Sequence, residues 1–173
     1  MRYYQKKFVK DINTILIIIA ICCIPFSSAC INENKIFDFE SVQSDFQIVA
    51  DDVLSFYRQS EKYENGEALN LCICYDQEAQ LYYLNYFVID DTVVSDDTVV
   101  LSALERVADA FDNDFPLWII SVNEIYVYFC NSTGDYAVVF SVNGTAPNSF
   151  SLNKEEKIKK RIKENNNWYQ IFR

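Results

Sequence analysis

The chain has 173 residues, of which 50% are hydrophobic, 16% aromatic and 23% charged. This composition is typical of a folded domain with a sizeable core and argues against intrinsic disorder. The formal net charge is −10. Such an acidic chain disfavours nucleic acid and anionic lipid as partners, because phosphate binding needs a basic surface. The chain has no histidine, which removes the Ser-His and Cys-His nucleophile pairs and histidine as a metal ligand.

The first 30 residues have the three-part pattern of a secretory signal peptide. Four basic residues come first, an apolar run over residues 12–26 follows, and small residues over 27–29 end the segment. As a helix, this run would cover about 22 Å, which is short of the roughly 30 Å hydrocarbon core of a membrane. The pattern therefore predicts a signal peptide over residues 1–29 rather than a permanent transmembrane anchor.

Ser28-Ala29-Cys30 resembles the end of a bacterial lipoprotein leader. In that class, a small residue precedes a cysteine that is lipidated and becomes the first mature residue. The resemblance implies a lipid on Cys30 and a protein tethered to the cell membrane outside the cytoplasm. It covers the leader alone and implies no domain family. Ser27 stands where that class usually has leucine, and Ser27 with Ala29 also fits ordinary signal peptidase, so plain secretion and an uncleaved anchor are the alternatives.

A single domain is expected over residues 39–173, after a short spacer over residues 30–38. Its first predicted element is an amphipathic helix over about residues 39–62, because apolar residues recur at alternating steps of three and four. Asp38 is the expected N-cap, and Asn65-Gly66 ends the segment. The apolar stripe is expected to pack on a sheet, and it consists of Phe39, Val42, Phe46, Val49, Val53, Phe56 and Tyr57.

A first β-hairpin is predicted from two strand-like runs, residues 69–75 and 81–89, which a polar turn connects. An acidic connection follows this hairpin. It lacks the glycine-centred spacing of an EF-hand loop, so we expect no metal site there. Its acidic residues are Asp90, Asp91, Asp96 and Asp97.

A second amphipathic helix is predicted over residues 98–111, with Asp97 as its N-cap. Residues 117–122 then predict a strand that leads into a second hairpin, formed by residues 125–130 and 136–142. Both faces of this hairpin carry apolar side chains, which indicates a central place in the sheet with cover on both sides.

The C-terminal part is predicted to hold a basic helix and a final strand. Asn153 and Glu156 resemble a capping box and begin a helix that runs to about Glu164, and residues 168–172 are strand-like. The basic residues over 157–163 are expected to form a solvated face that balances the acidic body. Binding to an anionic lipid or polymer is the alternative.

Three cysteines follow Cys30 in the chain, namely Cys72, Cys74 and Cys130. Cys72 and Cys74 would share one face of a strand, so at most one of them can bridge to Cys130. The favoured interpretation is three buried free thiols, and one disulfide to Cys130 is the alternative, since export favours oxidation. Cys-Ile-Cys is not a zinc pattern, and there is no histidine to activate a catalytic thiol.

Together these elements predict an α+β fold, in which one antiparallel sheet of five or six strands carries amphipathic helices on one face. The order helix, hairpin, helix, hairpin indicates two structural repeats, which the C-terminal helix and strand follow.

The expected function is a non-enzymatic interaction or binding module without a cofactor, tethered outside the membrane by a lipid on Cys30. Its partner, a protein or a small molecule, does not follow from the sequence. One alternative is a secreted carrier with a tyrosine-lined pocket, and another is a small secreted enzyme that uses carboxylates. An apolar pocket favours the carrier, paired buried carboxylates favour the enzyme, and a filled core with exposed aromatics favours the interaction module.

Overall fold

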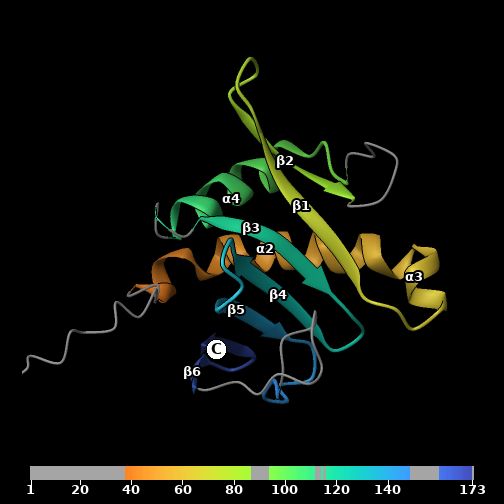
Figure 1. Ribbon diagram of the computed structural model, residues 1–173, viewed down its shortest axis with the longest axis vertical. Helices are drawn as coiled ribbons and strands as arrows, with labels where there is room; N and C mark the ends of the chain where they lie inside the picture. The colour runs from red at the N-terminus through yellow and green to blue at the C-terminus, as the bar shows by residue number, and fades with distance from the viewer. Residues whose placement is uncertain (1–37, 87–93, 112–113, 115, 149–159, 173) are drawn as a thin grey trace, which may run out of the picture. The chain divides into compact units, whose positions relative to one another are not determined.

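The computed structural model describes residues 38–86, 94–111, 114, 116–148 and 160–172 (Figure 1). These residues belong to one compact unit, Asn34–Arg173. The signal peptide, Cys30 and the spacer up to residue 37 lie outside the described residues. Among the residues that are described, no helix is long and apolar enough to cross a membrane.

The fold is α+β, as predicted, but its sheet has more strands than the five or six expected. Seven antiparallel strands form one open sheet in the order β2-β1-β3-β4-β5-β7-β6. The helices are α2 (Phe39–Arg58), α3 (Glu61–Glu64) and α4 (Thr98–Asp109), and the strands are β1 (Leu69–Asp76), β2 (Leu81–Tyr86), β3 (Leu117–Val122), β4 (Tyr126–Asn131), β5 (Tyr136–Ser141), β6 (Lys160–Asn165) and β7 (Trp168–Phe172).

The first predicted helix is present but ends earlier than expected. α2 stops at Arg58 rather than near residue 62, and the chain turns at Gln59 and Ser60 before the short α3 begins. Ser60 stabilises this turn, because its Oγ donates to the backbone carbonyl of Tyr57 at 2.7 Å. The break explains why the apolar stripe ends at Tyr57.

Asp38 and Asp97 occupy the predicted N-cap positions of α2 and α4, but only Asp97 caps its helix with a side-chain hydrogen bond. The side chain of Asp38 makes no capping hydrogen bond, and its backbone carbonyl instead accepts from Ser41 Oγ at 2.9 Å. At the start of α4, the N–H of Val99 donates to Asp97 Oδ1 at 2.7 Å, as expected of an N-cap aspartate. α4 ends at Asp109, shortly before the predicted end.

α2 holds its apolar stripe against the sheet, and α4 packs beside α2 (Figure 1). Phe46 is completely buried, and its ring centroid lies 4.9 Å from that of Phe129 on β4 and 5.8 Å from that of Trp168 on β7. The ring of Phe39 lies 5.5 Å from Trp168. The centre of the core is therefore an aromatic cluster between α2 and the sheet.

The predicted central hairpin is confirmed. β4 is the fourth of the seven strands and pairs with β3 on one side and β5 on the other. Its second face is buried as well, and the loop after β5 contributes to that cover, since the hydroxyl of Tyr169 donates to the carbonyl of Gly144 at 2.8 Å. The buried residues of this second face are Tyr128, Cys130, Ala137, Val139, Tyr169 and Ile171.

The predicted basic helix that runs to Glu164 is wrong over the residues that the structure describes. Lys160–Asn165 forms β6, which pairs antiparallel with β7 around a turn that contains Asn166. Asn166 has a φ of 27°, a left-handed conformation that asparagine tolerates at turns. A helix here had a thin apolar stripe and little to gain from packing, whereas a strand gains the hydrogen bonds of β7. The start of that helix, at Asn153 and Glu156, lies outside the described residues.

The predicted repeat of a helix followed by a hairpin is matched only roughly. α2 and α3 precede the β1–β2 hairpin, whereas α4 precedes a meander of three strands, β3, β4 and β5. The β6–β7 hairpin then extends the sheet beyond β5. The two halves therefore differ in strand number.

Replacing Phe46 with alanine is expected to lower the free energy of unfolding by about 3–5 kcal/mol, because the substitution leaves a cavity between α2 and the sheet. Urea denaturation followed by tryptophan fluorescence measures this change. Val99→Ala on α4 is the control, since Val99 is 58% exposed, and its effect is expected to stay within about 0.5 kcal/mol. A loss at Phe46 no larger than at Val99 would contradict a core centred on this ring.

Candidate interaction surface

Cys30, the one site residue predicted from the sequence, lies outside the described residues, so its lipidation stays a prediction. The three later cysteines are free thiols. Cys72 and Cys130 both lie opposite Ile119, so β3 separates their strands. Two strand spacings amount to about 9–10 Å, beyond the roughly 4.4–6.8 Å between α-carbons that a disulfide needs. The prediction of free thiols is confirmed and the alternative bridge to Cys130 is wrong, but only Cys130 is buried, since Cys72 and Cys74 are half-buried.

Cys72 is not activated as a nucleophile. Burial raises the pKa of the Cys72 thiol, the neighbouring Cys74 raises it further, and a hydrogen bond with Trp118 opposes the shift. A raised pKa keeps the thiol protonated, whereas a reactive cysteine needs its thiolate form. Across the described part of the chain, no group of three His, Cys, Asp or Glu side chains is placed to hold a metal ion.

Two shielded carboxylates on α2, Asp45 and Asp52, have different surroundings. Asp45 on α2 accepts a hydrogen bond from the Arg106 guanidinium on α4 at 2.7 Å, so this ion pair joins the two helices. Asp52 on α2 has one oxygen, Oδ2, that is buried without a hydrogen-bond partner among the described residues. Burial raises the pKa of Asp52, the negative charge of Asp97 raises it further, and a hydrogen bond from Ser95 opposes both. Asp97 itself is exposed and caps α4.

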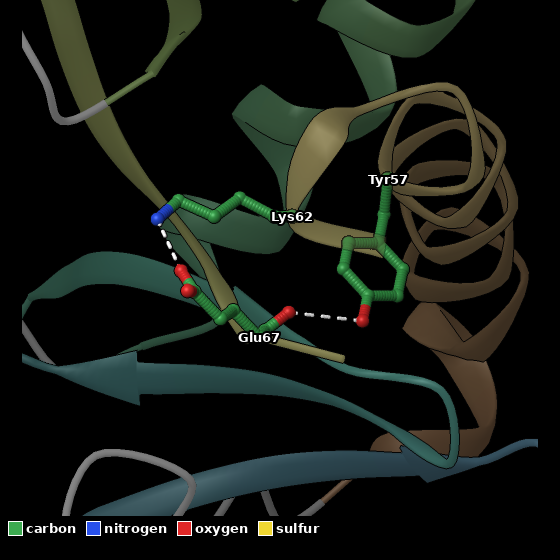
Figure 2. A network of polar contacts seen from close by, with 3 residues as sticks. All are labelled: Tyr57, Lys62 and Glu67. Atoms are coloured by element: carbon green, nitrogen blue, oxygen red, sulfur yellow. Dashed lines mark hydrogen bonds and ion pairs between the residues drawn. The ribbon is translucent and has the colours of Figure 1, made fainter. Parts of the chain in front are cut away.

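A small hollow of about 260 Å³ lies at the corner where α3 leads into β1. Figure 2 shows the contacts that hold this corner. The hydroxyl of Tyr57 donates to the backbone carbonyl of Glu67 at 3.0 Å, and the side chain of Glu67 forms an ion pair with Lys62. The volume is below the roughly 300–1,000 Å³ of most small-molecule sites. We therefore interpret these contacts as structural, since they stabilise the turn between α3 and β1.

A larger groove, of about 590 Å³, lies along β2 at the edge of the sheet, and we name it the β2 groove. One wall comes from the β1–β2 hairpin and the other from the chain that enters α4. Both walls carry a carboxylate, and the groove opens to solvent at the sheet edge. Its lining includes Asp76, Leu81, Tyr83, Asn85, Asp96 and Thr98.

The two edge strands of the sheet differ in character. β6 reads Lys-Arg-Ile-Lys-Glu-Asn, and charged residues on an edge strand discourage pairing with other chains. β2 reads Leu-Tyr-Tyr-Leu-Asn-Tyr and has no charged residue. β2 is therefore the less protected edge over residues 81–83, whereas at Leu84 the outward carbonyl already accepts from the N–H of Val94.

Large apolar side chains are exposed near the turn of the β1–β2 hairpin. Tyr75 is 49% exposed and Leu81 is 41% exposed. The ring of Tyr75 lies 4.9 Å from the ring of Tyr82 on the facing strand. Figure 1 shows that this end of the hairpin extends beyond the neighbouring β3 strand. Tyr82 itself is half-buried. An exposed tyrosine and an exposed leucine beside an uncharged edge are typical of a contact surface.

Comparisons with protein-family models, with curated proteins and with solved structures found no match to this chain. The interpretation of the β2 groove therefore depends on the residues themselves.

The β2 groove could not be identified from the sequence. Asp96 falls in the predicted acidic connection and residues 81–89 in a predicted strand, and no local pattern places the two side by side. The lack of charge in Leu81–Tyr86 was the available signal, because an uncharged strand is either central or an unprotected edge.

Thiol counting tests the cysteine assignment. A chain of residues 31–173 contains only Cys72, Cys74 and Cys130, and we expect three reactive thiols per molecule after denaturation without reductant. Cys130→Ser is the control and should leave two. A single reactive thiol in the unsubstituted chain would show that a disulfide forms and contradict the free-thiol structure.

Asp52→Asn is expected to stabilise the protein at neutral pH. The raised folded-state pKa means that folding favours the protonated carboxyl, so this contribution to stability is present at low pH and is lost as the pH rises through the folded pKa. Asparagine should therefore increase the free energy of unfolding at about pH 7, with a smaller gain at about pH 3. Urea denaturation at both values measures the difference.

The exposed neighbour Asp51 provides the matched control for this experiment. Asp51→Asn removes the same charge one residue away on α2, where the side chain is exposed, and should have the smaller effect at neutral pH. Equal gains from the two substitutions would mean that net charge alone, rather than burial of Asp52, is responsible.

Proposed function

We propose that this chain is a non-enzymatic interaction module that acts outside the cytoplasm and is held at the membrane by a lipid on Cys30. The observation that carries the interaction role is the uncharged outer edge of β2 beside the acidic β2 groove. The aromatic core supports it, because Phe46 is completely buried between α2 and the sheet and its ring lies 4.9 Å from that of Phe129. The signal-peptide pattern of residues 1–29, followed by Cys30, supports the proposed location outside the cytoplasm.

A lipid on Cys30 would supply an attraction to the membrane that the mature chain otherwise lacks. Residues 1–29 contain four basic residues and one acidic residue, so their removal changes the net charge from −10 to −13. Anionic lipid repels such a chain. Each buried methylene of an acyl chain contributes about 0.8 kcal/mol, and more than one acyl chain gives stable anchoring.

A carrier of a small ligand is the second candidate, and the size of the β2 groove favours it. The groove has the volume of an ordinary ligand site, and its lining includes the tyrosine ring of Tyr83 and the apolar side chain of Leu81. Its position at an open sheet edge favours a macromolecular partner instead, because small-ligand sites bury most of the ligand surface.

Cys30→Ala is expected to abolish labelling of the protein by a fatty acid, because the thiol is the proposed attachment point. The substituted protein should either remain unprocessed or appear in the medium after cleavage following Ala29. Metabolic labelling and fractionation of expressing bacteria measure both outcomes.

Cys23→Ala is the matched control, since it changes another cysteine of the leader and should leave labelling intact. Wild-type protein that is recovered from the membrane fraction without label would contradict the lipid anchor. That outcome would favour an uncleaved leader as the anchor.

A further inference from the structure

We propose that the outer edge of β2 receives an extended, basic segment of a partner protein. The segment adds to the sheet as a further strand and places lysine or arginine side chains in the β2 groove. This inference rests on the proposed function, because it names the partner chemistry of the same interaction module. It concerns the part of β2 nearest the hairpin turn, residues 81–83, because the outward carbonyl of Leu84 already accepts from the N–H of Val94.

The backbone groups that an added strand needs are present on this edge. The carbonyl of Leu84 points away from β1, since it accepts from the N–H of Val94 at 3.0 Å. Residues of an antiparallel strand alternate between facing the partner strand and facing outward, so Tyr82 also presents its N–H and C=O outward. Within the described residues, no hydrogen bond to another segment occupies the N–H or the C=O of Tyr82. They offer the pairing used in β-strand addition.

The charge of the β2 groove favours a basic partner. Asp76 and Asp96 line it, and among the described residues no lysine or arginine does. The net charge of −10 adds a longer-range attraction for basic proteins. A second copy of this chain is disfavoured, because pairing at β2 would bring the groove carboxylates Asp76 and Asp96 of two acidic copies close together.

One buried acceptor in the groove lining lacks a partner. Asn85 Oδ1 is shielded from solvent and has no hydrogen-bond partner in the described part of the chain, while Nδ2 of the same amide lies 3.9 Å from Cys74 Sγ. A buried acceptor without a donor is unfavourable. Lysine and arginine side chains offer donors and no acceptors, so a basic side chain in the groove would complete this site.

The two faces of the hairpin edge differ, and this difference defines the pattern of the incoming segment. Tyr82 and Tyr75 form a half-open aromatic surface on one face, while Leu81 and Tyr83 line the groove on the other. Alternate residues of an added strand would meet these two faces in turn. The fitting segment therefore alternates basic residues with β-branched apolar residues.

The binding test uses the full-length chain in detergent and the fluorescent peptide Lys-Val-Lys-Val-Lys-Val-Lys. Fluorescence anisotropy is expected to show that this peptide binds at least about tenfold more tightly than Glu-Val-Glu-Val-Glu-Val-Glu, with an affinity that falls as salt increases. Methylation of alternate backbone nitrogens of the basic peptide should weaken binding by about tenfold, because it removes the donors that pair with β2. Equal binding of the basic and acidic peptides, or no binding, would overturn the proposal.

Matched variants separate charge from backbone pairing. Asp96→Asn should weaken binding severalfold, whereas Asp51→Asn, which lies outside the groove lining, should not. Tyr82→Pro removes the outward N–H without taking a hydrogen bond from the β1–β2 pair, and proline is tolerated at such edge positions. Tyr82→Ala removes the same ring but keeps the N–H, so it should bind more tightly than Tyr82→Pro.

Amide hydrogen exchange of the unsubstituted chain gives a readout that no folding defect can mimic. The basic peptide is expected to slow exchange at the Tyr82 amide. Binding without this protection would overturn strand addition. Protection of Tyr82 that grows with protein concentration in the absence of peptide would identify a second copy as the occupant and overturn the basic partner.

The outcomes also separate this inference from the proposed function. Fatty-acid labelling of Cys30 with no peptide binding would support the lipid anchor and refute strand addition at β2. Peptide binding without fatty-acid labelling of Cys30 would support strand addition at β2 and refute the lipid anchor.

Discussion

The packing of α2 across the middle of the sheet is the constraint on which the rest of the structure depends. It brings Phe39 and Phe46, at the start of the domain, onto Trp168 near its end. Because these residues are far apart in the sequence, the core closes only when the last hairpin is in place. Asn165 extends the same link, since its amide hydrogen-bonds to Gln43 on α2. The far end of the β1–β2 hairpin carries little of this packing and is left exposed for contact.

The sequence predicted those elements in which local pattern and long-range pairing agree. α2 and α4 follow from apolar residues at helical spacing, and the β4–β5 hairpin follows from two apolar runs around a turn. Over Lys160–Asn165 the two influences conflict. The local pattern favoured a helix, but the free edge of β7 offered strand pairing, and tertiary context decides such cases. That pairing adds β6 and partly accounts for a sheet larger than predicted.

The candidate surface was harder to predict because it joins parts that only the strand order brings together. The place of Leu81–Tyr86 at an edge depends on β1 pairing with β3, and no local pattern carries that information. For the cysteines, one feature could be predicted from local pattern and another could not. Strand alternation alone placed Cys72 and Cys74 on one face, whereas excluding a bridge to Cys130 required the knowledge that β3 lies between their strands.

The unequal edges of the sheet have a consequence for stoichiometry. A sheet with two receptive edges can pass pairing from molecule to molecule and grow into a fibre. Here the opposite edge is β6, whose sequence contains Lys160, Arg161 and Lys163. Pairing at β2 therefore does not continue through the β6 edge to a further molecule. Under the proposed lipid anchoring and strand addition, copies gathered at one membrane would each bind a single partner strand, and the complex would remain discrete.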